Sequence, residues 1–250
     1  MMSGAARNVW ILGGTSAIAQ AYARRKAAQG GAILLIGLNA DHLKANAADL
    51  AARGATAAVE VLDLAGDVDR NAAVGKLVEQ HGFPDEVLIA YGILGDQQRA
   101  LTDPAHAADI ININFTSVAL WLLAICARRD PARALTLAAI GSVAGDRGRG
   151  KNFIYGAAKG GLDRFLEGLA HANAGTTLHV LRVKPGFVDT PMTAAMKKGG
   201  PLWASPDRVA ADIDKAIAAR AAVIYTPWFW RWIMLVIRLL PRPLFNRLKI

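Results

Sequence analysis

Three side chains near the middle of the sequence could together move a proton. Ser142 follows an apolar run, Tyr155 comes 13 residues later, and Lys159 lies four residues beyond Tyr155. Residues at i and i+4 share one face of a helix, so this spacing predicts that the phenol and the ammonium are neighbours. A nearby ammonium favours the phenolate, and we expect it to lower the pKa of Tyr155 from its usual value of about 10. Such a phenol can exchange a proton with a carbinol oxygen held by Ser142, although tyrosine–lysine pairs at this spacing also occur by chance on surface helices.

A glycine turn near the start of the sequence could hold phosphate groups. The first apolar run, residues 9–12, leads into Gly13, Gly14, Thr15 and Ser16, and a helical pattern follows. Backbone N–H groups at such a turn and the N-terminus of the next helix can bind the pyrophosphate of a dinucleotide. The G-x-G-x-x-G fingerprint is absent, so an ordinary strand-to-helix turn explains this segment equally well when it is taken alone. A secretory signal is disfavoured, because the glycines interrupt the apolar run after four residues.

The hydrophobic pattern predicts the scaffold that would position these residues. Apolar runs typical of buried strands alternate with alanine-rich stretches at helical spacing. The expected strands are residues 9–12, 32–36, 56–61, 86–91, 134–140, 177–183 and 222–225. The expected helices are residues 18–29, 41–53, 69–80, 104–129, 154–173 and 206–220. Apolar strands that alternate with helices indicate an α/β protein, a doubly wound parallel sheet in three α/β/α layers.

The composition excludes several classes of protein. With 250 residues, 53% of them hydrophobic, the chain suits one domain with a full core and is not disordered. Its one cysteine, Cys126, rules out an internal disulfide, and its five histidines are scattered, so we expect no metal site. Residues 223–250 hold five basic residues and no acidic one, which leaves only +4 of the net charge of +9 for the rest. A charge of only +4 outside this segment, together with the lack of a recognition motif, argues against nucleic-acid binding.

Taken together, the motifs resemble those of the short-chain dehydrogenase/reductase superfamily over nearly the whole chain. The matching pieces, in order, are the turn at Gly13, Asp63, Gly92, Asn114, Ser142, residues 155–159 and residues 185–190. The resemblance implies a Rossmann-like fold and an NAD(P)(H)-dependent oxidoreductase that reduces a ketone to a secondary alcohol. We expect the domain to span residues 1–226, with a substrate lid at about 190–206 and a separate tail at 227–250. The resemblance also implies a homodimer or homotetramer, formed through the helices that hold Asn114 and Tyr155.

The resemblance assigns a role to each catalytic position. Tyr155 would be the general acid, Ser142 would orient the substrate carbonyl, and Lys159 would lower the pKa of the tyrosine and hold the nicotinamide ribose. Asn114 would hold a water that links Lys159 to solvent. Asp63 would face the adenine ring. The full set of expected cofactor contacts is Gly13, Thr15, Ser16, Ala17, Ile18, Leu38, Asn39, Asp63, Leu64, Gly92, Tyr155, Lys159, Pro185, Gly186, Val188 and Thr190.

The sequence departs from the family pattern at three places. Ala17 and Ala19 stand where glycines are usual, and we expect their methyl groups to displace the cofactor or the helix slightly. The segment after the fourth strand is Ile-Ala-Tyr-Gly (residues 89–92) in place of Asn-Asn-Ala-Gly. At the end of the second strand, Leu38 and Asn39 supply neither the acidic residue that selects NAD nor the arginine that selects NADP, so the choice stays open.

Basic residues before Tyr155 suggest a substrate that carries phosphate. Arg147, Arg149 and Lys151 lie within five residues, and guanidinium groups bind phosphate oxygens as forked donors. Lys197 and Lys198, in the expected lid, point the same way. The alternative interpretation is a basic loop that is simply solvated.

The tail combines tryptophans and arginines. Residues 228–240 form an apolar stretch that is too short for a membrane span and carries Arg231 and Arg238. Tryptophan favours the membrane interface and arginine can reach lipid headgroups, so the tail predicts peripheral attachment to the inner, cytoplasmic face of a membrane. Packing against a sister subunit is the alternative.

The loop and the tail together favour a lipid-linked, phosphate-bearing ketone. Residues 90–96, 147–156 and 241–250 are similar to the reductases of the decaprenylphosphoryl-ribose 2-epimerase type. That resemblance implies a polyprenylphosphoryl 2-keto-pentose as substrate, cell-wall lipid-sugar biosynthesis as the setting, and a flavin oxidase as partner. The alternatives are another lipid ketone, such as a 3-keto sphingoid base or a 3-oxoacyl thioester, and a non-catalytic dinucleotide-binding protein.

Overall fold

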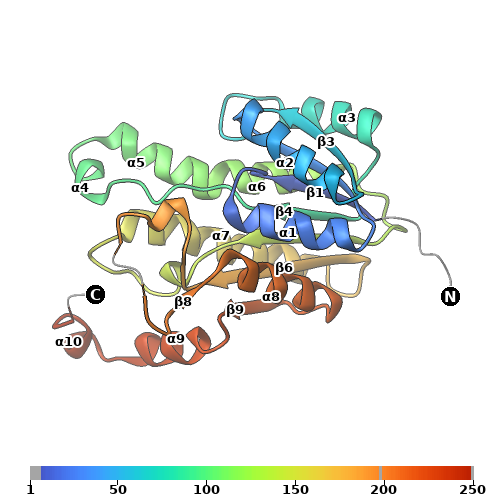
Figure 1. The fold of residues 1–250 in the computed structure, drawn as a ribbon. Helices are drawn as coiled ribbons and strands as arrows, with labels where there is room; N and C mark the ends of the chain where they lie inside the picture. Colours follow the sequence, from blue (N-terminus) through green and yellow to red (C-terminus); the bar gives the residue numbers. More distant parts are fainter. Residues whose placement is uncertain (1–6, 197–198, 249–250) are drawn as a thin grey trace.

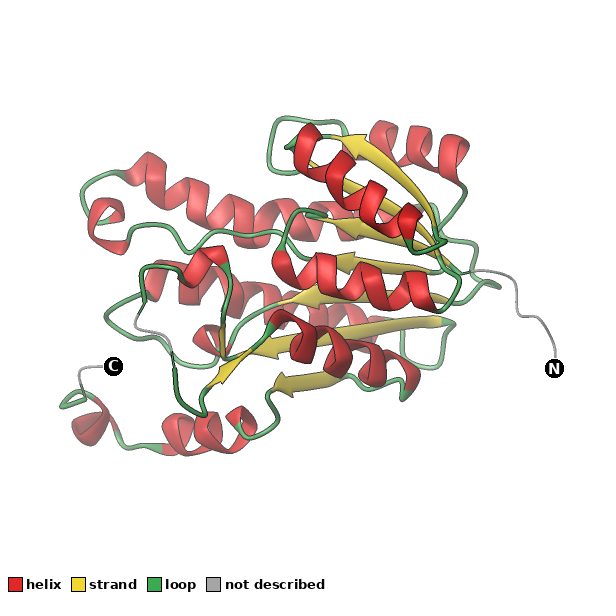
Figure 2. Ribbon diagram, viewed as in Figure 1, coloured by secondary structure: helices red, strands yellow, loops and turns green. Residues whose placement is uncertain are grey.

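A single parallel sheet forms the centre of the molecule. The computed structural model describes residues 7–196 and 199–248. Within these residues, seven parallel strands pair in the order β3-β2-β1-β4-β5-β6-β9 (Figure 2). The strands are β1 (Asn8–Leu12), β2 (Ala32–Gly37), β3 (Thr56–Val61), β4 (Glu86–Ile89), β5 (Leu135–Ile140), β6 (Leu178–Pro185) and β9 (Val223–Thr226). This order confirms the doubly wound parallel sheet, and the direction of winding reverses between β1 and β4.

Helices cover both faces of the sheet (Figure 1). On one face lie α1 (Ala17–Ala28), α2 (Ala40–Ala52) and α8 (Pro206–Ala218). On the other lie α3 (Arg70–His81), α6 (Ser117–Ala127) and α7 (Phe153–Ala172). The smaller elements are α4 (Gln97–Ala100), α5 (Pro104–Ile111), η2 (Val143–Gly145), η3 (Pro191–Thr193), α9 (Trp230–Leu239), α10 (Arg242–Phe245) and the strand pair β7 (Phe187–Val188) and β8 (Trp203–Ala204).

The central strands are apolar at nearly every position because both of their faces are buried. In β1, Trp10 and Leu12 pack with α3, α6 and α7, whereas Val9 and Ile11 pack with α1 and α8. Successive side chains of a strand point to opposite faces, so a strand between two helical layers needs apolar residues on each. The pattern therefore identified the central strands correctly.

The long helix expected at 104–129 contains a π-helical turn. Between α5 and α6 the chain forms the turn η1 (Asn112–Thr116), and Asn114 lies within it, fully buried. The side chain of Asn114 donates to the carbonyl oxygens of Ile93 (2.8 Å) and Ile110 (2.9 Å). A π turn inserts one residue into a helix, and such turns are frequent at functional sites. Apolar spacing gave no sign of it.

The tail is packed onto the domain. Trp230 and Met234 of α9 are buried, at 4% and 0% exposure, against Val143, Phe187 and Tyr225. Gly186 makes room for the indole of Trp230, because a Cβ there would lie 1.9 Å from the indole nitrogen. The apolar stretch 228–240 thus forms a helix whose inner face is buried against the domain.

Among the described residues, one helical stretch is long and apolar enough to cross a membrane, namely Pro104–Ala127. Half of its most apolar window is buried inside the protein. Its buried side chains pack against the sheet, whereas Ile111, Leu120 and Leu123 are exposed.

Candidate active site

A large cavity opens at the carboxyl ends of the central strands. Its volume is about 1070 Å³, and it lies where the winding of the sheet reverses, the usual ligand site of such folds. The expected site residues that line it are Gly13, Thr15, Ser16, Ala17, Ile18, Gly92, Ser142, Arg149, Lys151, Tyr155, Lys159, Pro185, Gly186, Val188 and Thr190. The expected residues that do not line it are Leu38, Asn39, Asp63, Leu64, Asn114 and Arg147. Lys197 and Lys198 lie outside the described residues.

The glycine turn connects β1 to α1 and requires glycine at its first position. Gly13 adopts a φ of 91°, and a Cβ at this position would lie 2.6 Å from the backbone nitrogen of Tyr91. Ser16 caps α1 without a side-chain hydrogen bond, so its hydroxyl does not occupy the free N–H groups at the helix start. Ala17 lines the cavity, whereas Ala19 is fully buried in the core. Of the two methyl groups expected to displace a cofactor, only that of Ala17 faces the cavity.

Ser142 and Tyr155 are brought together, but the expected direction of the tyrosine's pKa shift is wrong. Tyr155 is 9% exposed, and its burial raises the pKa above the usual value, while a hydrogen bond with Ser142 lowers it by less. The nitrogen of Lys159 lies 6.0 Å from the centre of the tyrosine ring. A buried phenol with a raised pKa keeps its proton at neutral pH, so in this structure Tyr155 is poised as a proton donor.

Burial also shifts the pKa of Lys159. Its side chain lies in the interior, and this burial lowers its pKa from 10.5 to about 8. Its ammonium donates to the carbonyl oxygen of Ile140 at the end of β5 (2.9 Å). Gly92 keeps the space beside it open, because a Cβ there would lie 3.4 Å from the ammonium and 2.7 Å from the side-chain oxygen of Asn114.

The loop after Ser142 is packed tightly against the catalytic helix. Ser142 caps η2, accepting from the backbone N–H of Ala144 (3.1 Å). A Cβ on Gly145 would lie 2.7 Å from the backbone nitrogen of Gly160 in α7. The close approach fixes the distance between the serine loop and the helix of Tyr155.

Arg147 corrects one expectation about the phosphate site. Its guanidinium donates to the carbonyl oxygens of Ile237 and Leu240 at the end of α9 and lies 3.7 Å from the centre of the Phe245 ring. These carbonyls have no partner inside the helix, so the arginine caps it. Arg147 holds the tail and does not face the cavity, whereas Arg149 and Lys151 do.

The expected adenosine contacts lie at the strand ends away from the cavity lining. Leu38 is 70% exposed, and the side chain of Asn39 caps α2 by accepting from the N–H of His42 (2.9 Å). Asp63 is exposed and accepts from the N–H of Ala65 (3.0 Å), while Leu64 is buried. The cofactor role of these four residues stays a prediction.

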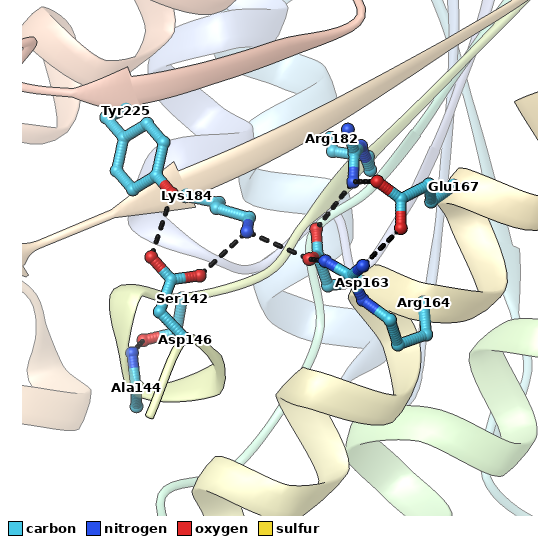
Figure 3. Close-up of polar contacts among 9 residues, drawn as sticks. All are labelled: Ser142, Ala144, Asp146, Asp163, Arg164, Glu167, Arg182, Lys184 and Tyr225. Atoms are coloured by element: carbon cyan, nitrogen blue, oxygen red, sulfur yellow. Dashed lines mark hydrogen bonds and ion pairs between the residues drawn. The ribbon is translucent and has the colours of Figure 1, made fainter. Parts of the chain in front are cut away.

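A network of buried charges beneath the serine loop was missed by sequence reasoning (Figure 3). Lys184 of β6 forms ion pairs with Asp146 (2.7 Å) and Asp163 (2.9 Å). Tyr225 of β9 donates to the other oxygen of Asp146 (2.8 Å). A lysine between apolar strand residues is a signal that could have pointed to it, because buried charges need partners.

An apolar wall also went unnoticed. Apolar side chains from the loop after β4, from β7, from the expected lid and from α9 line the same cavity. They are Leu94, Phe187, Met192, Met196, Trp230, Ile233 and Ile237. The tail is therefore part of the site.

Comparison with known proteins identifies the family. Residues 7–200 match the family model described as short chain dehydrogenase. An uncharacterized oxidoreductase of Mycobacterium tuberculosis is 41% identical over 244 residues, 96% of each chain. A 3-oxoacyl-[acyl-carrier-protein] reductase of Pseudomonas aeruginosa is 31% identical over 184 residues, 73% of this chain and 74% of that one. The chain belongs to the short-chain dehydrogenase/reductase family, whose members are NAD(P)-dependent oxidoreductases.

Solved structures show the same fold. A short-chain dehydrogenase from Sphingobium yanoikuyae in complex with NADPH superposes with a TM-score of 0.81 at 23% identity, covering 92% of each chain. One from Mycobacterium paratuberculosis bound to NAD gives 0.75 at 20% identity, covering 88% of this chain and 95% of that one.

The residues present fit a nicotinamide dinucleotide. The cavity is wide enough for one, the left-handed glycine and the start of α1 form a phosphate cradle, and a buried ammonium faces the interior. Gly13, Thr15, Ser16 and Ile18 would hold the pyrophosphate, and Lys159 with Tyr155 would hold the nicotinamide ribose. No cluster of metal-ligating side chains occurs among the residues that the structure describes.

Proposed function

We propose that this reductase converts a ketone on a lipid-linked, phosphate-bearing sugar, such as a polyprenylphosphoryl 2-keto-pentose, to a secondary alcohol. The observation that carries the proposal is the presence in one cavity of an apolar wall and of Arg149, whose buried Nε has no hydrogen-bond partner among the described residues. A neutral, small alcohol would need neither feature. If the protein is one half of an epimerase, a flavin oxidase that makes the ketone is its partner.

The side chains divide the chemistry. Tyr155 donates the proton to the carbonyl oxygen, and Ser142 donates a hydrogen bond that holds this oxygen in place. A bound reduced nicotinamide supplies the hydride. Lys159, protonated below a pH of about 8, provides positive charge beside the phenol and holds the ribose hydroxyls. Asn114 supports this arrangement by fixing the segment around Ile93.

Arg149 is the best-supported ligand for a substrate phosphate. It lines the cavity, and its buried Nε has no hydrogen-bond partner among the described residues. Burial also lowers its pKa, since the charge is partly removed from water. A buried donor without a partner destabilises the protein, and a hydrogen bond to an anionic ligand would remove this penalty. The exposed Lys151 extends the positive rim of the cavity.

A 3-oxoacyl thioester is the alternative substrate. The Pseudomonas aeruginosa relative is named as a 3-oxoacyl-[acyl-carrier-protein] reductase, and another relative, from Allochromatium vinosum, as an acetoacetyl-CoA reductase. A thioester carrier also brings a phosphate that Arg149 could bind. A 3-keto sphingoid base fits the apolar wall but leaves the arginine without a ligand. The presence of Ser142, Tyr155 and Lys159 argues against a non-catalytic dinucleotide-binding protein.

The outer face of α9 supports attachment to an anionic membrane surface on the cytoplasmic side. An exposed apolar stripe runs along it at helical spacing, made of Trp232, Leu235, Val236 and Leu239. Arg231 and Arg238 are exposed beside it. Because residues 223–250 contain no acidic residue, a second copy docked through this face would bring arginines against arginines. Lipid phosphates would complement the charge, and tryptophan suits the interface.

A second apolar surface is available for self-association. Ile111 at the end of α5 and Leu120 and Leu123 on α6 are 42–47% exposed although large and apolar. We propose that a homodimer or homotetramer forms through this face, which leaves α9 free for the membrane. Size-exclusion chromatography of Leu123→Glu, which should dissociate the oligomer, tests this assignment.

Measured reduction rates test the proposed substrate. Purified protein with NADPH or NADH should reduce a polyprenylphosphoryl 2-keto-pentose, and Arg149→Met should raise its KM by about 10-fold or more, as expected for one lost charge-assisted hydrogen bond. With acetoacetyl-CoA as the competing probe, a higher kcat/KM than for the keto-pentose would favour the thioester. Reduction of small secondary ketones alone, with no effect of Arg149→Met, would refute the phosphate proposal.

Co-flotation with lipid vesicles tests the proposed membrane attachment. The protein should rise with phosphatidylglycerol vesicles and not with phosphatidylcholine vesicles, and Trp232→Ser with Leu239→Ser should abolish this. Leu101→Ser, which removes a similarly exposed side chain elsewhere, is the matched control. Loss of a dimer with unchanged vesicle binding would instead assign the face to a sister subunit.

A further inference from the structure

We infer that Lys184 is a positioning residue. It fixes the relative positions of three segments: the loop that follows Ser142, the helix α7 with Tyr155 and Lys159, and the turn at Pro185 and Gly186. Its ammonium lies between the carboxylates of Asp146 and Asp163, at 2.7 and 2.9 Å (Figure 3). All three side chains are buried, with exposures of 7%, 3% and 9% for Lys184, Asp146 and Asp163. The inference rests on the reductase reaction of this site and not on which ketone it takes.

Each member of the trio belongs to a segment that carries a reacting or binding group. Asp146 lies four residues after Ser142, at the end of the turn η2 that Ser142 caps. Asp163 lies on α7, one turn beyond Lys159 and two beyond Tyr155, on the same side of the helix. Lys184 itself directly precedes Pro185 and Gly186, which line the cavity. One cation therefore joins three elements that are far apart in the sequence.

The second layer of the network leaves little freedom to the carboxylates. Tyr225 donates to the remaining oxygen of Asp146 (2.8 Å), and Arg182 and Arg164 pair with Asp163 at 3.4 and 2.7 Å. Lys184, with Arg164 and Arg182, keeps the pKa of Asp163 below its usual value, and the two carboxylates of Asp146 and Asp163 keep the pKa of Lys184 above its own, so the groups stay charged. Tyr225 also lies on β9, which leads into α9, so the network reaches the helix that forms the apolar wall.

Stability alone is a poor explanation for such a trio. Replacing a buried ion pair by apolar side chains is often neutral or stabilising, since the charges lose their hydration. Geometry is a better explanation, because an error of about 1 Å in a catalytic group can slow a reaction by about 100-fold. The backbones of Gly145 and Gly160 are in close contact, so the serine loop has no room to move closer to α7.

The chain contains a matched control near the amino end of the central strand β4. Lys26 is buried to the same degree and also pairs with two carboxylates, Glu86 (3.1 Å) and Asp214 (2.9 Å). A tyrosine, Tyr22, is hydrogen-bonded to Glu86, as Tyr225 is to Asp146. None of these residues lines the cavity. A purely structural role would make the two lysines equivalent.

The experiment compares Lys184→Met with Lys26→Met in the full chain. The ketone is whichever of acetoacetyl-CoA and the polyprenylphosphoryl keto-pentose the wild type reduces, and kcat is measured well below the melting temperature of each variant. We expect Lys184→Met to lower kcat by about 30- to 100-fold with a smaller change in the KM of the ketone, and Lys26→Met to change kcat by less than about 3-fold at a similar loss of stability. Lys184→Arg, which keeps the charge, should restore most of kcat.

A second measurement needs no substrate. Amide hydrogen exchange of the cofactor-free protein should quicken in residues 142–152 for Lys184→Met but stay at the wild-type rate there for Lys26→Met. If the wild type reduces neither ketone, the substrate proposal fails while this test still decides the inference. Equal kcat losses in the two methionine variants, or unchanged exchange of the serine loop in Lys184→Met, would overturn it. If Lys184→Met does not fold, Tyr225→Phe, which removes one hydrogen bond from Asp146, should show the same pattern more weakly.

Discussion

Replacing Lys159 by methionine should make the cofactor-free protein more stable while removing its activity. The ammonium is buried, and burial lowers its pKa from 10.5 to about 8. The unfolded chain binds this proton more tightly than the folded protein, and the difference corresponds to about 3 kcal/mol of lost stability at neutral pH. Methionine removes this penalty. It also removes the hydrogen bond to the carbonyl of Ile140, worth about 1 kcal/mol. The expected net gain is about 2 kcal/mol.

The pH dependence identifies the cause of this gain. Below a pH of about 8 both states of the wild type are protonated and the penalty is complete. As pH rises from there to about 10.5, the folded protein loses the proton first, so the penalty fades. Urea unfolding of the wild type and Lys159→Met should therefore differ by about 2 kcal/mol at neutral pH, with the methionine variant losing this lead by a pH of about 10.5.

Lys151→Met is the control for this prediction. It removes an exposed ammonium from the same cavity, so the free energy of unfolding should stay within about 0.5 kcal/mol of the wild-type value. A Lys159→Met protein that is less stable than the wild type at neutral pH, or whose stability difference is the same at both pH values, would refute the reasoning.

Further predictions concern the proton donor, the cavity and the tail. Tyr155→Phe should lower kcat by about 100-fold or more with little change in stability, because it removes one proton donor; unchanged turnover would mean that another group is the acid. The kcat/KM for reduction should fall as pH rises through about 8, where Lys159 loses its charge, and a flat stopped-flow profile between neutral pH and about 9 would contradict this. Gly13→Ala should lose NAD(P)H binding in a fluorescence titration and be destabilised by more than about 1 kcal/mol, because alanine is strained at a φ of 91° and its Cβ would clash with Tyr91. Gly186→Ala should displace the indole of Trp230, and a tail that stays as resistant to limited proteolysis as in the wild type would argue against this contact.

Local pattern was sufficient for most of the scaffold. The central strands are buried on both faces, so each is an apolar run that can be recognised without neighbours. Each of the six alanine-rich stretches lies close to one or more of the observed helices. The π turn at Asn114 could not be predicted from the sequence, because it depends on hydrogen bonds to Ile93 and Ile110 that no residue spacing encodes.

For the site, spacing along one helix was enough to pair Tyr155 with Lys159 and a turn was enough to place Gly13. The direction of the tyrosine's pKa shift was wrong, because the pairwise argument included the ammonium and left out burial, which is the larger effect. Arg147 and Arg149 are two residues apart and chemically alike, yet one caps α9 and the other faces the cavity.

The sequence by itself determined the alternation of strands and helices, the proposed catalytic side chains and the basic, tryptophan-rich tail, because each of these depends on residues close together along the chain. Only the tertiary structure decided that the tail forms a wall of the cavity, that Lys184 lies between Asp146 and Asp163, and how far burial shifts the pKa of Lys159. Dehydration and ion pairing depend on atoms brought together from distant segments, so they exist only once the chain has folded.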